Sequence, residues 1–175
     1  ARIAEAVGTP AFIYSAATFR EHYTRLATAF AEIDPIICYS IKSCGNLIII
    51  KLLGELGAGM DVVSGGELFR AGQAGFTSSG PFDPGKIVFA GVGKTDIEIN
   101  EAIDQGIGWF NIESEAELAN LIELAGRRPD VISGSKVVRG ALRVNPDVDP
   151  KTHRHTSTGK RESKFGVDLE RARNV

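Results

Sequence analysis

The residue with the clearest chemical potential is Lys42, which ends an apolar, β-prone run and directly precedes a polar turn. The run covers residues 37–41 and the turn covers residues 43–46. A strand end of this kind holds a lysine at the mouth of a sheet or barrel. Partial desolvation at such a place makes the amine a nucleophile toward aldehydes. Position alone leaves a simpler interpretation open, in which Lys42 is a surface lysine that closes a strand.

Other polar and charged residues also follow predicted strands. They are the segments 64–67, 91–95 and 113–114, and the residues Arg143 and Asn145. In a βα barrel the loops after the strands all open on one face, where the active site is built. A doubly wound sheet would gather ligands at a single switch point. Because nearly every strand end carries such residues, the sequence favours the barrel.

The elements that must position these residues alternate between short apolar strands and amphipathic helices. The predicted strands cover residues 11–14, 36–41, 60–63, 87–90, 109–112 and 141–144. The predicted helices cover residues 17–30, 47–56, 67–74, 96–104 and 114–125. Thr95 or Asp96 is a suitable cap for one helix, and Ser114 with Glu117 makes a capping box for the next. The unbroken alternation predicts a parallel sheet with helical crossovers.

The composition limits the classes of function. The chain has 175 residues, of which 43% are hydrophobic and 24% charged, and its net charge is −2. This profile predicts a soluble globular protein without a transmembrane helix, and it favours neither nucleic acid nor a membrane as a partner. Two cysteines are too few for a disulfide framework and indicate a reducing cytoplasm. We expect Cys38 to be buried in a strand, whereas Cys44 is either a small loop residue or close to a ligand.

A nucleotide-binding interpretation of segment 91–95 fails on spacing. Gly91-Val92-Gly93-Lys94-Thr95 invites comparison with a P-loop, but the position that needs the motif's first glycine is Val88, inside a predicted strand. The phosphate-binding nest therefore cannot form in the usual way. We expect replacement of the lysine in this segment to leave the activity intact.

Two further motifs also fail to support their usual functions. Gly57-Ala58-Gly59 resembles the start of a dinucleotide-binding fingerprint, but it precedes a predicted strand instead of following one. His153 and His155 lie two residues apart in a polar stretch from 151 to 164, with no thiol or carboxylate spaced to complete a zinc site. We therefore predict no metal site.

Six motifs in one order resemble the fold-type III, pyridoxal-phosphate-dependent decarboxylases, and among them the diaminopimelate decarboxylase branch. The motifs are the segments 39–42, 61–68, 89–95, 110–114, 142–147, and 152–159 with 164–166. The resemblance implies an α/β fold, a TIM-like (β/α) barrel of the alanine racemase-like type. Because a complete barrel needs about 250 residues and eight strands, we expect about five of the eight barrel strands here.

The resemblance also implies a domain organisation and a site. Residues 1–15 would hold a strand that joins a C-terminal β domain, which is absent from this chain, and residues 16–175 would form an incomplete barrel that binds pyridoxal 5'-phosphate. Lys42 would carry the cofactor. Asp61 would lie near that lysine, and Glu67 and Arg143 would line the cofactor pocket.

The activity implied by the resemblance is the decarboxylation of meso-diaminopimelate to L-lysine and CO₂, in lysine biosynthesis. The implied enzyme is a cytoplasmic lyase that forms a homodimer, with the active site at the subunit interface and a small amino acid as its substrate. Two alternatives remain: a decarboxylase of the same fold that acts on arginine, ornithine or carboxynorspermidine, and a non-catalytic homologue that binds the cofactor. We expect the 175-residue chain alone to be inactive and to self-associate through the open edges of its sheet.

Overall fold

The computed structural model describes residues 2–146, 148 and 166–172, and the chain forms two compact units, Ala1–Pro35 and Ile36–Val175. The first unit contains α1 (Arg2–Val7), α2 (Ala16–Ala29) and a 3₁₀ turn, η1 (Ala31–Ile33). The Ser15 side chain caps α2 by accepting a hydrogen bond from the Thr18 N–H at 3.3 Å. None of the residues in these three elements is buried.

The strand predicted at residues 11–14 is absent from this unit, where the segment has no regular secondary structure. A strand exists only when a second strand pairs with its backbone N–H and C=O groups. No strand among the described residues pairs with this segment, and Phe12 is 88% exposed. Its pairing with a C-terminal β domain, and with it the predicted boundary at residue 15, stays a prediction.

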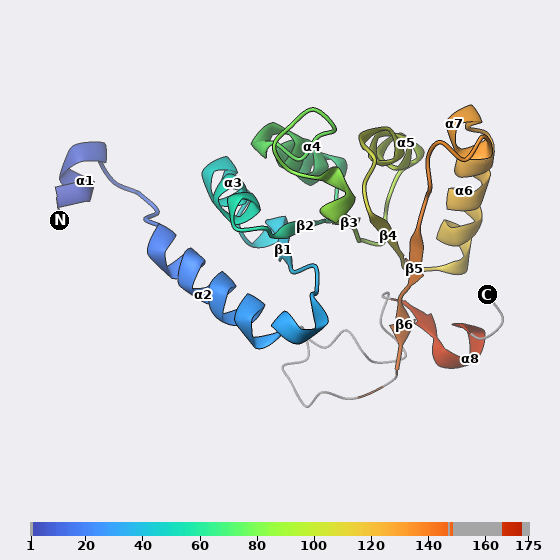
Figure 1. The fold of residues 1–175 in the computed structure, drawn as a ribbon, viewed down its shortest axis with the longest axis horizontal. Helices are drawn as coiled ribbons and strands as arrows, with labels where there is room; N and C mark the ends of the chain where they lie inside the picture. The colour runs from blue at the N-terminus through green and yellow to red at the C-terminus, as the bar shows by residue number, and fades with distance from the viewer. Residues whose placement is uncertain (1, 147, 149–165, 173–175) are drawn as a thin grey trace. The chain divides into compact units, whose positions relative to one another are not determined.

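The second unit is built on a parallel sheet of five strands in sequential order. The strands are β1 (Cys38–Ser40), β2 (Gly59–Val62), β3 (Ile87–Phe89), β4 (Trp109–Ile112) and β5 (Gly140–Leu142). The helices of the connections are α3 (Leu47–Glu55), α4 (Gly65–Ala74), α5 (Asp96–Gln105) and α6 (Glu115–Gly126). Figure 1 shows these four helices on the same side of the sheet. Sequential strands with helices on one side form part of a βα barrel, and a doubly wound sheet would reverse its order instead.

The five strands predicted after residue 35 are all present, with changes at their ends. The strand predicted at 36–41 is shorter, because the segment Ile41–Ser43 turns as a 3₁₀ helix, η2. The strand predicted at 141–144 divides into β5 and a two-residue strand, β6 (Val144–Asn145), which pairs in parallel with β7 (Val167–Asp168).

The structure adds short elements that the sequence patterns do not reveal. They are η3 (Pro84–Lys86), α7 (Pro129–Ile132) and α8 (Leu169–Ala172), in addition to α1. The predicted loop at 151–164, with His153 and His155, lies outside the described residues. Among the helices that the structure describes, none is long and apolar enough to cross a membrane.

Side chains alternate along the strands between two environments. The positions that face the helices form the core, and each is at most 3% exposed: Met60, Val62, Ile87, Phe89, Phe110 and Ile112. The positions between them, such as Asp61, Val88 and Trp109, are partly exposed. They lie on the opposite side of the sheet, which in a closed barrel is the interior. We call this side the open face of the sheet.

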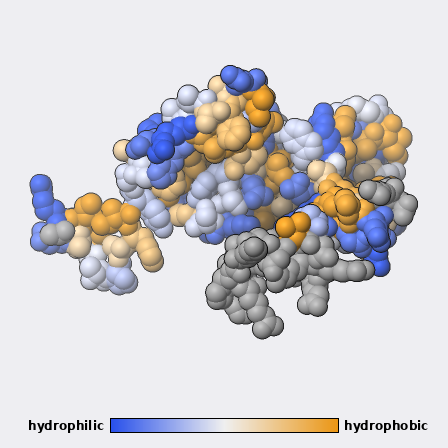
Figure 2. Space-filling view, turned by 90° about the horizontal axis from the view of Figure 1, so that it is seen from below, coloured by the Kyte–Doolittle hydropathy of each residue, from blue (hydrophilic) through white to orange (hydrophobic). Residues whose placement is uncertain are grey.

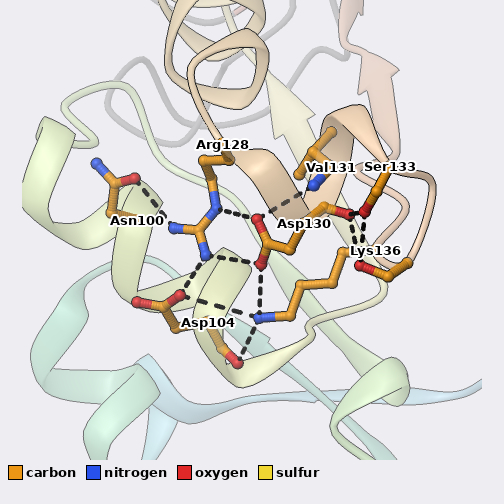
Figure 3. Close-up of polar contacts among 8 residues, drawn as sticks. Asn100, Asp104, Arg128, Asp130, Val131, Ser133 and Lys136 are labelled. Carbon is orange, nitrogen blue, oxygen red and sulfur yellow. Dashed lines mark hydrogen bonds and ion pairs between the residues drawn. The ribbon is translucent and has the colours of Figure 1, made fainter.

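A network of charged residues fastens α5 to the α6–α7 connection at the edge where the strands begin. Arg128 donates hydrogen bonds to Asp130 at 3.1 and 3.2 Å, to Asn100 at 3.3 Å, and to Asp104 (Figure 3). The Lys136 ammonium pairs with Asp130 at 3.4 Å and donates to the Asp104 carbonyl at 3.2 Å. The hydrogen bonds from Arg128 lower the pKa of Asp130 to about 2. This edge is the stabilising side of a βα fold.

Candidate functional site

Lys42 lies directly after β1, at the edge where the strands end. Its neighbour Ile41 is 1% exposed and anchors the turn, and the Ser43 hydroxyl donates to the Ser40 carbonyl at 2.7 Å. The Lys42 side chain itself is exposed, and it makes no hydrogen bond or ion pair with another described residue. The partial desolvation that we expected is therefore not seen in the described residues. The backbone holds this lysine in place while its amine stays accessible.

Asp61 lies on β2 opposite Ser40, which precedes Lys42 by two residues. The Ser40 hydroxyl donates a hydrogen bond to the Asp61 carboxylate at 2.7 Å. Burial raises the pKa of the Cys38 thiol, and the Asp61 charge raises it further. Cys38 is half-buried rather than buried, because it alternates with Tyr39 along β1 and shares the open face with Ser40. Cys44 is also half-buried, and its carbonyl accepts a hydrogen bond from the Tyr39 hydroxyl at 3.1 Å.

Glu67 takes part in the start of α4. Its backbone N–H donates to the Ser64 hydroxyl at 3.2 Å, and its carboxylate accepts a hydrogen bond from the Val63 N–H at 2.9 Å. These contacts satisfy backbone donors that the first turn of a helix leaves without partners. Glu67 thus has a structural role in the described residues, and its predicted place in the cofactor pocket stays a prediction.

The next two helices begin in a similar way. Thr95, one of the two predicted caps, begins α5 and forms a capping box with Glu98, and the Glu98 carboxylate also accepts a hydrogen bond from the Gly65 N–H of α4 at 2.6 Å. The backbone N–H groups of Gly65 and Thr95 lower the pKa of Glu98. The capping box predicted at the start of α6 is only half formed: the Ser114 hydroxyl accepts from the Glu117 N–H at 3.2 Å, but the Glu117 carboxylate accepts from the Glu113 N–H instead of the Ser114 N–H. Glutamates therefore tie together the loops from which a site would be built.

Lys94 is a buried structural cation, which is a role that spacing alone did not reveal. Its side chain is 1% exposed. The ammonium donates to the carbonyls of Gly91 and Asn111 at 2.8 and 2.7 Å and to the Glu117 carboxylate at 2.5 Å. Val88 lies inside β3, so the P-loop interpretation fails in the structure as well. Because all three ammonium hydrogens have acceptors, we no longer expect replacement of Lys94 to be harmless.

Arg143 lies between β5 and β6 and pairs with a residue that the sequence singled out only as part of a strand end. Its guanidinium donates to both carboxylate oxygens of Glu113, at 3.1 and 3.2 Å. The Glu113 side chain is 2% exposed and that of Arg143 is 40% exposed. The pairing of Ile112 with Leu142 explains the contact, because it makes Glu113 and Arg143 the next neighbours along β4 and β5.

The strand register thus brings Lys42, Asp61 and Arg143 to the same edge of the sheet, whereas Glu67 lies in the cap of a helix. Two of these residues have a hydrogen-bonding partner on a neighbouring strand or at its end. Asp61 accepts a hydrogen bond from Ser40, and Arg143 pairs with Glu113. In the part of the chain that the structure describes, no three His, Cys, Asp or Glu side chains gather to hold a metal ion. The arrangement offers an accessible amine, a carboxylate and a paired guanidinium.

Known proteins are similar to this chain in both sequence and fold. The family described as pyridoxal-dependent decarboxylase, pyridoxal binding domain, matches residues 16–175. A diaminopimelate decarboxylase from Aquifex aeolicus is 47% identical over 170 residues, which are 97% of this chain and 37% of that protein. The chain therefore spans less than half the length of this relative.

Solved structures give the same result for the fold. A diaminopimelate decarboxylase from Helicobacter pylori, complexed with L-lysine, superposes with a TM-score of 0.81 at 34% identity and covers 96% of this chain and 41% of its own. The enzyme from M. jannaschii, in complex with L-lysine, superposes with a TM-score of 0.80 at 37% identity. That match covers 97% of this chain and 38% of the other.

Proposed function

This chain belongs to the pyridoxal-dependent decarboxylases through their pyridoxal binding domain, and from this premise we propose that the full-length protein decarboxylates meso-diaminopimelate to L-lysine and CO₂. By full-length protein we mean this chain with any sequence encoded on either side of it. The proposal is supported by the name of the relative that is 47% identical and by the L-lysine bound in two similar structures. The single observation in this chain that carries it is the accessible amine of Lys42 at the end of β1.

The residues present fit pyridoxal 5'-phosphate, the cofactor of this family. A covalent link to the aldehyde of the cofactor needs a primary amine, and Lys42 makes no hydrogen bond or ion pair that would occupy its amine among the described residues. An anionic phosphate or carboxylate needs a cation, and Arg143 supplies a partly exposed guanidinium at the same edge of the sheet. Asp61 adds a carboxylate that Ser40 orients.

These residues have separate tasks in the proposed reaction. The bound cofactor supplies an electron sink for the electron pair that remains when an amino acid loses CO₂. Lys42 would hold the cofactor through its Nζ atom, and the same nitrogen, once the substrate amine has taken its place, would supply the proton that replaces the lost CO₂. Asp61 would place a negative charge beside β1, the strand that Lys42 follows. Arg143 would orient an anionic group of the cofactor or substrate. The α3–α6 side of the sheet keeps these groups on a rigid, packed support.

We further propose that the full-length protein is a cytoplasmic homodimer with the active site at the subunit interface. The free thiols of Cys38 and Cys44 are consistent with a reducing compartment. An interface at the active site is consistent with the accessibility of Lys42 in this chain, because a partner could cover it.

Two measurements on the full-length protein test the function. Borohydride reduction followed by peptide mapping should place a pyridoxyl group on Lys42, and a label on Lys51 or Lys94 instead would contradict the assignment. CO₂ should be released faster from meso-diaminopimelate than from arginine or ornithine. A preference for ornithine or arginine would identify another decarboxylase of the same fold. Bound cofactor without CO₂ release from any of them would identify a non-catalytic homologue.

A further inference from the structure

A buried carboxylate supports the one arginine of the candidate site. Glu113 is buried, with only 3% of its surface exposed. Each oxygen of the Glu113 carboxylate accepts a hydrogen bond from the same nitrogen of Arg143. A carboxylate that is removed from water is costly unless a cation and hydrogen bonds compensate it. The pair neutralises the buried Glu113 carboxylate, and it also holds the Arg143 guanidinium in one position.

The backbone that carries Glu113 is itself held from two sides. The Glu117 carboxylate accepts a hydrogen bond from the Glu113 N–H at 3.2 Å, and the buried Lys94 ammonium donates to the Asn111 carbonyl at 2.7 Å. Lys94 and Glu117 also pair with each other at 2.5 Å. The backbone at the end of β4 is thus held by hydrogen bonds before and after Ile112. The position of the Glu113 carboxylate is therefore restricted.

The backbone of Arg143 is fixed as well. Its N–H donates to the Ile112 carbonyl at 2.9 Å, and its carbonyl accepts from the Val167 N–H at 2.8 Å. With both backbones in place, the guanidinium is the part of the pair that extends toward solvent, since its side chain is 40% exposed and that of Glu113 only 2%. The guanidinium and Lys42 both lie where the strands of the sheet end, although they follow the two outermost strands, β5 and β1.

We propose that Glu113 is a positioning residue that holds the Arg143 guanidinium ready for an anionic oxygen of the bound molecules. This inference rests on the proposed function. The anionic oxygen belongs either to the phosphate of the cofactor or to a carboxylate of the substrate. A guanidinium that is already oriented loses little conformational entropy when such a group binds.

The test compares Glu113→Gln, Arg143→Lys and the double variant of the full-length protein, with Glu101→Gln as the control. Glu101 is exposed on α5 and has no ion pair or hydrogen bond among the described residues. Four quantities are measured: the Kd of pyridoxal phosphate for the apoprotein, the Kd of pyridoxal without phosphate, and the KM and kcat for meso-diaminopimelate. The melting temperature of each variant records any purely structural effect.

If Arg143 meets the phosphate, each single variant should bind pyridoxal phosphate roughly tenfold more weakly and pyridoxal unchanged. If it meets the substrate, the Kd of pyridoxal phosphate should stay the same while KM rises roughly tenfold at similar kcat. In both cases the double variant should lose no more than one single variant, because Glu113 acts through Arg143. The control should match the unmodified protein.

The proposal is overturned if Glu113→Gln lowers only the melting temperature, or if the losses of the two single variants add. Should Glu113→Gln fail to fold, the partly exposed Arg143→Lys decides the matter, and unchanged Kd and KM values in that variant overturn the proposal. A failure of the proposed function looks different. The unmodified protein would then carry no cofactor on Lys42, or it would not release CO₂ preferentially from meso-diaminopimelate.

Discussion

Two lysines, one after β1 and one after β3, have opposite environments. Lys42 is exposed at the end of β1 and makes no hydrogen bond or ion pair with a described residue, whereas the Lys94 side chain is 1% exposed and donates to three acceptors. A reactive amine must be accessible to its partner, while a fully hydrogen-bonded ammonium has no hydrogen left for one. Lys42 is therefore suited to a chemical role and Lys94 to a structural one.

We predict that Lys94→Met destabilises the full-length protein by about 3–5 kcal/mol, because it leaves the Glu117 carboxylate without its cation in a largely buried place. Chemical denaturation measures the change in the free energy of unfolding. Lys51→Met is the matched control, since Lys51 is exposed on α3, and it should change stability by less than about 0.5 kcal/mol. Equal stabilities for the two variants would contradict the structural role of Lys94.

At the scale of elements, the helices are fastened at both edges of the sheet. Where the strands end, glutamates near the starts of α4, α5 and α6 accept backbone hydrogen bonds, and Glu98 reaches from α5 to the Gly65 N–H of α4. Where the strands begin, Arg128 joins α5 to the α6–α7 connection. Fixed helices keep the loops between them in place, which a site built from several loops requires.

The Glu98 contacts predict a loss of stability in acid. Backbone hydrogen bonds lower the pKa of Glu98 in the folded chain below its usual 4.5. A carboxylate of this kind contributes its stabilisation above the ordinary pKa, and the contribution disappears as the pH falls through the lowered value. Unfolding midpoints of the full-length protein should therefore fall less between pH 5 and pH 3 in Glu98→Gln than in the unmodified protein. Parallel pH profiles for the two would show that this bond between α4 and α5 is not formed in solution.

The Arg128 network predicts a further loss of stability in acid. The pKa of Asp130 is lowered to about 2, so its contribution should be complete above pH 4 and should be lost between about pH 4 and pH 2. Asp130→Asn should remove this part of the pH dependence and leave that of Glu98 in place. The difference between the melting temperatures of the two proteins, followed from pH 6 to pH 2, measures it. A difference that does not shrink toward pH 2 would argue against the ionised Asp130.

At the scale of the whole molecule, the five-stranded sheet ends in β1 and β5, and neither has a second neighbour among the described strands. Apolar side chains are exposed as well, and Figure 2 shows them in several separate patches on one face. A groove of 560 Å³ beside β5 is lined mainly by apolar residues, among them Leu121, Ile122 and Val137. Open strands and exposed apolar surface both favour association with other chains.

We therefore predict that residues 1–175, expressed alone, will not be a stable and active monomer. Sedimentation velocity should show self-association or aggregation, and thermal unfolding should be broad. Lowering the protein concentration should shift the distribution toward smaller species. A soluble monomer with one sharp, cooperative transition would mean that the described sheet is sufficient by itself.

The sequence by itself determined the order and type of the main elements. Apolar runs of strand length alternating with helical patterns predicted the parallel sheet, and the β1 to β5 order confirms the barrel-like arrangement. The sequence offered Thr95 or Asp96 as the cap of α5, and Thr95 is the cap, because capping depends on residues close together in the chain. The family followed from six motifs in order, and the match to residues 16–175 confirms it.

The tertiary structure alone decided which side chains meet. The strand predicted at 11–14 is missing because a strand depends on a partner that local sequence cannot supply. Lys94 looked like part of a failed P-loop, and only the packing of β3, β4 and α6 around it shows a buried cation. Glu113 and Arg143 are 30 residues apart in the chain. They touch because the pairing of β4 with β5 brings these strand ends together, and such long-range pairing leaves no periodic signal in the sequence.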